Sequence, residues 1–183
     1  PNTLPLWIVK KAFEIKVEKI ESLLLPNTNF HPSTRMCVEI QLFYGGEPIC
    51  HAKRTKLVPF SSTPIFDQVL SFKSLRVCNL PRETRICITV LAKEPKNTTP
   101  LAWVAFALFD YHDLMKSGQL EAWMWPNDRA NPIGVCGSCL EMKQRGLNKL
   151  TMQLDRYYAP VLFTHPDDVV NVQISQQHRA ASE

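Results

Sequence analysis

The first candidate for chemistry is a C-x-x-C motif, Cys136-Gly137-Ser138-Cys139. Such a pair can ligate zinc when a second pair or histidines follow at suitable spacing, and it can act as a redox dithiol where a strand meets a helix. His112 and His165 are distant from it in sequence, and the surrounding pattern is that of a β-rich chain. We therefore expect Cys136 and Cys139 to be surface loop cysteines, and an independent enzyme built on them is disfavoured.

A calcium site is the second chemistry to consider, because the polar loops at residues 21–33, 58–64 and 93–100 are predicted to meet at one end of the fold. Calcium binding requires several carboxylate oxygens around one ion. These loops supply only Glu21 and Glu94, with Asp67 just inside the following strand. Isolated acids do not build a calcium cage, so we expect no metal site.

Other catalytic motifs are missing from the sequence. The six glycines are scattered and form no phosphate-cradling loop ahead of a helix. The chain has no kinase catalytic loop, no D-F-G sequence and no G-x-S-x-G nucleophile motif. We therefore predict no catalytic residue and no cofactor-binding residue, and we do not expect the chain alone to be an enzyme.

Basic residues gather on one predicted strand, with Lys53, Arg54 and Lys56, and in one loop, with Lys93 and Lys96. Two interpretations stay open: a solvated outer face, or a contact with an anionic lipid surface worth about 1 kcal/mol per charge. The net charge of +4 on 183 residues permits an anionic partner. It is far below the charge density of nucleic-acid binders, so we expect no nucleic-acid partner.

Period-two alternation of apolar residues positions these side chains on eight short strands. The strands are expected at residues 13–17, 35–43, 48–57, 65–75, 84–92, 101–111, 119–125 and 150–154. Residues 101–111 are apolar on both faces, which is typical of a central strand whose second face is also covered. The pattern predicts an all-β fold, an eight-stranded antiparallel β-sandwich.

Two short local structures are expected between strands. Asp110 or Asp113 can cap a turn that ends at Gly118, where a positive φ costs least. Ser138 and Glu141 have the spacing of a capping box, which predicts a short helix in the irregular region 127–146.

Length and composition predict one domain over residues 1–160 and a linker over residues 161–183, where the alternation dissolves. No run approaches the roughly 18 apolar residues of a membrane helix, and the first residues do not resemble a signal peptide. The six cysteines lie mostly within strand patterns, as reduced thiols do, which favours a cytoplasmic location. The chain begins at Pro1, and we expect it to be a fragment of something larger.

Several stretches resemble one known family in the same order along the chain. They are GGEPIC at 45–50, NLPRETRICI at 79–88, PLAW at 100–103, LFDYHDLMKSGQLEAWMWP at 108–126 and NPIGVCGS at 131–138. Together they resemble the C2 domain of phosphoinositide 3-kinase catalytic subunits, and class I enzymes most. The resemblance implies a sandwich with the type II strand order, placed ahead of the helical domain of a larger enzyme.

The resemblance also implies roles that composition cannot supply. The parent enzyme would phosphorylate phosphoinositides with ATP and magnesium, while this domain would be a non-catalytic scaffold. It would contact the regulatory-subunit coiled coil through two loops, at Asn27, Asn29, Asn127, Asp128 and Arg129.

The resemblance implies two further contacts, one with neighbouring domains and one with a membrane. Trp103 and Phe109 would pack against neighbouring domains such as the helical and kinase domains, unless loop 127–146 folds over them. The basic residues would bind membranes without calcium, and the enzyme would be cytoplasmic and recruited to the inner face of membranes. The alternative function is an autonomous module that targets anionic membranes through the basic strand and loop.

Overall fold

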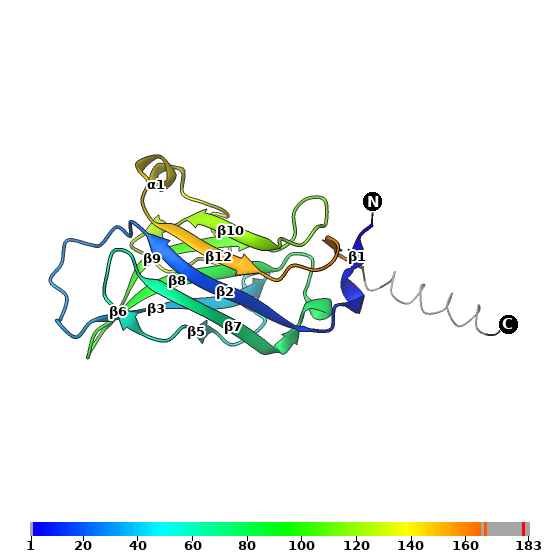
Figure 1. Cartoon of the computed structure of the whole chain (residues 1–183), viewed down its shortest axis with the longest axis horizontal. Coiled ribbons are helices and arrows are strands. Elements are labelled where there is room, and N and C mark those ends of the chain that lie inside the picture. The colour runs from blue at the N-terminus through cyan, green and yellow to red at the C-terminus, as the bar shows by residue number, and fades with distance from the viewer. Residues whose placement is uncertain (1, 166, 168–180, 182–183) are drawn as a thin grey trace.

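Alternating side chains build two stacked antiparallel sheets (Figure 1). The computed structural model describes residues 2–165, together with residues 167 and 181. The four-stranded sheet runs in the order β10 (Gly118–Trp123), β12 (Lys149–Leu154), β2 (Ala12–Glu21) and β7 (Ile65–Arg76). The seven-stranded sheet runs β11 (Trp125–Pro126), β9 (Thr98–Ala107), β8 (Arg85–Lys93), β3 (Arg35–Tyr44) and β4 (Glu47–Pro48), with β5 (Lys53–Arg54) and β6 (Val58–Pro59) also paired to β3.

Short elements complete the fold. A small parallel pair joins β1 (Leu4–Pro5) to β13 (Val161–Leu162). Two 3-10 helices, η1 (Leu6–Ile8) and η2 (Val77–Asn79), and one α-helix, α1 (Leu140–Arg145), are present in the described residues. The all-β antiparallel sandwich is therefore confirmed, whereas the type II strand order stays a prediction.

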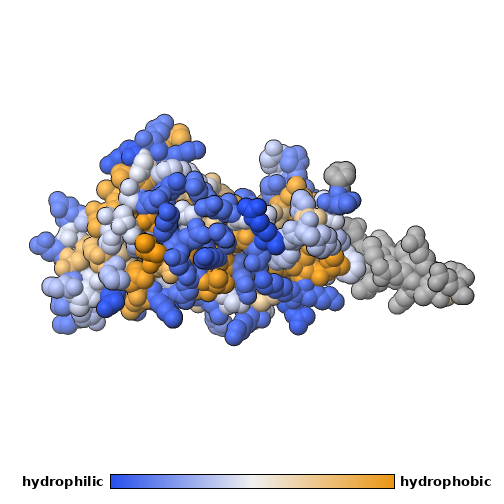
Figure 2. Space-filling view, viewed as in Figure 1, coloured by the Kyte–Doolittle hydropathy of each residue, from blue (hydrophilic) through white to orange (hydrophobic). Residues whose placement is uncertain are grey.

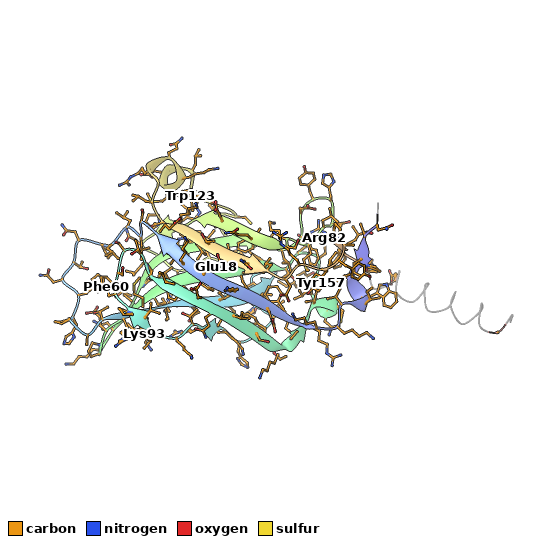
Figure 3. The ribbon with its side chains drawn as sticks, viewed as in Figure 1. Glu18, Phe60, Arg82, Lys93, Trp123 and Tyr157 are labelled. Carbon is orange, nitrogen blue, oxygen red and sulfur yellow. The ribbon has the colours of Figure 1, made fainter. Side chains whose placement is uncertain are left out.

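The core lies between the sheets, as the parity of the strands predicts. The seven-stranded sheet contributes Val38 and Ile40 of β3 and Ile86 and Ile88 of β8 to the core. The four-stranded sheet contributes Val17 of β2. Burying such side chains contributes about 1.5–3 kcal/mol each. The outer face of the four-stranded sheet is largely hydrophilic, with Glu18 at its centre (Figures 2 and 3).

The strand predicted at residues 48–57 is wrong in its continuity, because three two-residue strands replace it. Pro48 has no N–H with which to continue the ladder. Farther on, the Thr55 hydroxyl oxygen accepts a hydrogen bond from the Val38 N–H (2.9 Å), so a side chain takes the place of a backbone partner. The other seven predicted strands are present, with shifted ends. β9, for example, ends at Ala107.

The three polar loops do meet at one end of the sandwich. The Leu23 N–H donates to the Ser62 carbonyl (2.8 Å), and the rings of Phe30 and Phe60 lie 4.8 Å apart. The third loop is shorter than predicted, because β8 and β9 extend into it and leave only a turn closed by the Glu94 N–H and the Asn97 carbonyl (2.8 Å). Figure 3 labels Phe60 and Lys93 at this end.

The opposite end contains residues that were predicted to belong to a linker. Val161 is buried, and the Phe163 ring packs edge-on against Phe109 at 5.4 Å. Residues 161–163 thus belong to the folded body, so the predicted boundary at residue 160 is too early. Most of the remaining predicted linker, residues 166 and 168–180 and 182–183, lies outside the described residues.

Asp110 caps the turn at this end, one of the two predicted alternatives. Its carboxylate accepts hydrogen bonds from the His112 N–H (2.8 Å) and the Leu114 N–H (3.0 Å). Burial on its own would raise the pKa of Asp110, but these two bonds outweigh it and hold the pKa below its ordinary value of 3.8. Gly118, at φ +72°, ends the turn as expected.

Replacing Asp110 by alanine is expected to destabilise the domain by about 1 kcal/mol, because two N–H groups lose their acceptor. A lowered folded pKa stabilises the fold above the unfolded pKa, and this contribution is lost as pH falls through the folded pKa. When the pH falls from about 5 to 2, the free energy of unfolding of Asp110→Asn, measured with urea, should therefore decrease less than that of wild type. The control Asp128→Asn should follow wild type, and an identical pH profile for Asp110→Asn would contradict the assignment.

Candidate functional site

Two cations face each other on the outer side of the seven-stranded sheet. Arg35 of β3 and Lys93 of β8 are directly opposite in the antiparallel register. Their chain neighbours Met36 and Ala92 are buried in the core, so Arg35 and Lys93 lie on the outer face. Like charges directly opposite each other destabilise a sheet. An anion placed over this pair would offset that repulsion.

One carboxylate, that of Glu39, lies on the same face of β3, four residues beyond Arg35. Glu39 accepts a hydrogen bond from Arg54 Nε at 2.8 Å and pairs with Arg129 Nη1 at 3.5 Å. Its side chain is only 17% exposed, which strengthens both interactions relative to open solvent. Arg54 and Arg129, which pair with Glu39, form together with Arg35 and Lys93, farther along the same face of the sheet, what we call the basic face.

The buried Cys37 thiol lies beneath the basic face. Burial raises the pKa of Cys37, while the positive charges of Arg54 and Lys93 lower it and Glu39 raises it. Arg54, Lys93 and Glu39 therefore all lie close enough to the Cys37 thiol to change its pKa.

The basic face adjoins a segment that crosses the outer side of the same sheet, residues 127–139, which we call the covering segment. The Ala130 N–H donates to the Thr89 hydroxyl (3.1 Å), and the Arg85 guanidinium donates to the carbonyls of Pro132 (2.8 Å) and Gly134 (3.0 Å). Burial raises the pKa of Cys87, on this face of β8, to about 11. The second apolar face of β8 and β9 is therefore covered within this chain.

The covering segment and the start of α1 expose large apolar side chains outward. The exposed fractions are 76% for Ile133, 54% for Val135 and 65% for Leu140. These three residues, called the apolar cover, lie within eight positions of the sequence. Large apolar side chains exposed on a fixed segment are candidates for contact with a partner.

The C-x-x-C sequence joins the open edges of the two sheets. The Gly137 N–H donates to the Ala105 carbonyl of β9 (2.7 Å), and the Cys139 N–H donates to the Trp123 carbonyl of β10 (2.7 Å). Cys139 is buried, so the expectation of two surface cysteines is wrong for Cys139, although Cys136 is exposed. The predicted helix forms as α1, but Ser138 accepts from the Trp123 N–H (2.9 Å) instead of capping it.

A family model described as Phosphoinositide 3-kinase C2 matches residues 32–169, which is more than half of the chain. This chain belongs to the phosphoinositide 3-kinase C2 family. The family predicted from the sequence is thus confirmed, and the assignment to class I stays a prediction.

Relatives of this C2 domain are phosphoinositide kinases. Phosphatidylinositol 3-kinase 3 of Dictyostelium discoideum is 26% identical over 88% of this chain and 9% of its own length. Phosphatidylinositol 3-kinase 1 of the same organism is 26% identical over 85% of this chain and 11% of its own length. The human phosphatidylinositol 4-phosphate 3-kinase C2 domain-containing subunit beta is 28% identical over 50% of this chain and 6% of its own length. The C2 domain therefore spans about a tenth of the curated relatives it matches.

The predicted membrane residues of the C2 domain are only partly brought together. Arg54 and Lys93 belong to the basic face. Lys53 is half-buried on β5, Lys56 is exposed beyond it, and Lys96 is exposed in the turn between β8 and β9. Arg35 and Glu39 were not predicted, because their outward parity in β3 is visible in the sequence but their neighbours on β5 and β8 are not.

The residues expected to contact a regulatory subunit lie in two places. Asn27 and Asn29 are exposed in the loop after β2, at the end where the three loops meet. Asn127, Asp128 and Arg129 are exposed at the start of the covering segment, where the Asn127 N–H donates to the Leu101 carbonyl (2.8 Å). No hydrogen bond or ion pair of the described residues joins the two groups, although Arg129 connects the second group to the basic face.

The expected packing of Phe109 against another domain is not supported, because Phe109 is 2% exposed and contacts Phe163 of this chain. Trp103 is half-buried and stacks on Trp125 at a ring distance of 5.9 Å. Within residues 2–165, 167 and 181, no three His, Cys, Asp or Glu side chains are grouped so that they could hold a metal ion. No helix in the described part of the chain is long and apolar enough to cross a membrane.

Proposed function

We propose that this C2 domain is a non-catalytic scaffold within a phosphoinositide 3-kinase catalytic subunit. The names of its relatives support a parent lipid kinase, for which ATP and magnesium would be the cofactors, bound outside this domain. The chain covers about a tenth of those relatives, so most of such a protein consists of other domains. The parent enzyme would be cytoplasmic and act at the inner face of membranes.

The observation that carries the scaffold proposal is the apolar cover. Ile133 and Val135 expose more than half of their surface although they sit on the covering segment, which hydrogen bonds fix to the sheet, and Leu140 at the start of α1 is equally exposed. Large apolar side chains that are held outward in this way favour contact with another surface. The helical or kinase domain of the same parent chain is the proposed partner of these side chains, and half-buried Trp103, stacked on Trp125, would add to the contact.

A second contact is proposed with the coiled coil of a regulatory subunit. Asn27 and Asn29 offer exposed amides at the loop end, and Asn127, Asp128 and Arg129 offer mixed polar groups at the start of the covering segment. Side-chain amides both donate and accept, which suits the polar flank of a helix. The two groups lie at different places on the domain, so a long rod is a better match than a small globular partner.

The basic face favours a second candidate function, calcium-independent binding to anionic membranes. Two of its four cations, Arg54 and Arg129, pair with the Glu39 carboxylate, and the other two, Arg35 and Lys93, oppose each other in the register. Lipid phosphates would supply the missing negative charge. Lys53, Lys56 and Lys96 would add weaker long-range attraction, because charges near a membrane act within a Debye length of about 10 Å.

The scaffold proposal is tested by placing an aspartate in the apolar cover. In the longer protein that contains this domain, Ile133→Asp is expected to lower the melting temperature by about 2–4 °C, because a charge replaces a buried contact. In the 183-residue chain the same change should leave the melting temperature within about 1 °C, as for other exposed positions. The matched control Tyr111→Asp, at an exposed position near the opposite end, should be silent in both proteins. Equal effects of Ile133→Asp in both would contradict the proposal.

The regulatory contact is tested by calorimetric titration of a regulatory-subunit coiled coil into the 183-residue chain. Asn29→Ala and Arg129→Ala should each weaken binding by about 1–2 kcal/mol, because each removes hydrogen bonds at the interface. Asn79→Ala, at the far end of η2, is the matched control and should bind like wild type. Undiminished binding by both test variants would remove these residues from the contact.

The membrane hypothesis is tested by flotation with phosphatidylserine vesicles in the presence of a calcium chelator. The double variant Arg35→Gln, Lys93→Gln should bind at least about tenfold more weakly, given about 1 kcal/mol per charge. Glu39→Gln should bind severalfold more tightly, because it removes the single negative charge of the basic face. The control Lys16→Gln, Lys19→Gln on β2 carries the same net charge change and should retain binding. Affinity that follows net charge alone, or that ignores salt, would count against the basic face.

A further inference from the structure

A largely apolar cavity of about 190 Å³ lies between the two sheets, beside the edge strands β9 and β10. Val104 and Phe106 of β9 form one wall, and Leu120 and Ala122 of β10 with Met152 of β12 form the other. Leu120 and Met152 are directly opposite in the β10–β12 register. The site belongs neither to the basic face nor to the apolar cover.

The cavity exists because the edges of the sheets are bridged by small residues. Gly137 and Ser138 form the roof of the cavity. Hydrogen bonds fix this roof to the two sheets, from the Gly137 N–H to the Ala105 carbonyl and from the Trp123 N–H to the Ser138 hydroxyl. Gly137 has a φ of +101° and contributes no side chain, and nothing lies within 4 Å of where its Cβ would be. Ala122 is also short, so the gap between Phe106 and Met152 stays unfilled.

A lysine ammonium stands at one side of the cavity. Lys116 Nζ donates a hydrogen bond to the Ala107 carbonyl and lies 6.0 Å from the centre of the Phe106 ring. Burial lowers the pKa of Lys116, while the charges of Cys136 and Asp110 raise it. An ammonium group has three donors, and the Ala107 carbonyl uses one of them.

The second charged group of the lining is Glu121, whose charge is balanced by an ion pair. Its carboxylate pairs with Lys149 at 3.3 Å, and Lys149 also lies over the Trp123 ring. Lys116, by contrast, forms no ion pair among residues 2–165. A ligand that enters between the sheets therefore meets an apolar interior with a net positive charge at its side.

We propose that this cavity binds a small amphipathic anion, namely a medium-chain aliphatic carboxylate, with its chain between Phe106 and Met152 and its carboxylate at Lys116. An apolar cavity of about 150 Å³ is known to accept benzene, so this volume suits a chain of roughly six to eight carbons. The carboxylate accepts hydrogen bonds from the ammonium donors that Ala107 leaves free. The proposal does not depend on the parent enzyme.

Octanoate is the probe, titrated into the 183-residue chain with carbon-13 labelled methyl groups and followed by NMR. Saturable shifts are expected for the methyl groups of Met152, Ala122 and Val104. Butyrate should bind far more weakly, because each buried methylene strengthens binding about fourfold. Octanol should bind about tenfold more weakly than octanoate, because it lacks the charge that meets Lys116.

Two variants and two matched controls separate the walls from the charge. Leu120→Phe enlarges a side chain of the cavity wall and should weaken octanoate binding at least tenfold, whereas Leu140→Phe on exposed α1 should not. Lys116→Met should abolish the preference for octanoate over octanol, whereas Lys143→Met should keep it. Lys116→Met loses the hydrogen bond to the Ala107 carbonyl and could unfold for that reason. Leu120 is half-exposed, so Leu120→Phe is expected to fold and tests the site independently.

The proposal is overturned if octanoate produces no saturable shift at about 1 mM, a concentration that detects weak binding. It is also overturned if the shifts centre on Ile133, Val135 and Leu140, which would mean general adsorption to the apolar cover. Equal binding of octanol and octanoate to wild type would remove Lys116 from the site and overturn the ligand class.

Discussion

The structure depends on covering a central strand pair that is apolar on both faces. One face of β8 and β9 packs against the four-stranded sheet, as in any sandwich. The other face would lie open to water without the covering segment, which is fixed to Thr89, Arg85 and Ala105 by hydrogen bonds. Because loops carry polar backbone groups, they can cover an apolar face only where such partners exist.

The covering segment also creates the surfaces on which the proposed function rests. It carries Arg129 to Glu39 and so completes the basic face, and it turns Ile133 and Val135 outward. At its end, Gly137 and Cys139 join the two sheet edges and roof the cavity beside Lys116. One irregular stretch therefore links the core, the charged face and the apolar cover.

A domain of the phosphoinositide 3-kinase C2 family built in this way presents surfaces instead of a reaction centre. The four-stranded sheet is largely hydrophilic on its outer face (Figure 2), with Ile65 and Val69 of β7 exposed there, whereas the outer side of the seven-stranded sheet carries the basic face and the apolar cover. The two sheets thus differ in what they offer a partner. This asymmetry follows from which sheet has the second apolar face and needs a cover.

The sequence by itself determined seven of the eight predicted strands, the sandwich and the family. In a half-buried strand, apolar residues at every second position all face the core, as Val38, Ile40, Ile86 and Ile88 do. The period of two therefore predicts both the strand and its buried face. The sequence also determined that Asp110 or Asp113 caps a turn and that the polar loops share an end, because both follow from chain order and short-range geometry.

Only the tertiary structure decided which side chains meet across strands. Arg35 lies opposite Lys93, and Glu39 joins Arg54 to Arg129, residues far apart in sequence. The burial of Cys139 and Phe109 and the packing of Phe163 likewise depend on segments that have no periodic pattern. Local periodicity specifies a face, but cross-strand register and loop path are set by long-range packing, which one sequence does not display.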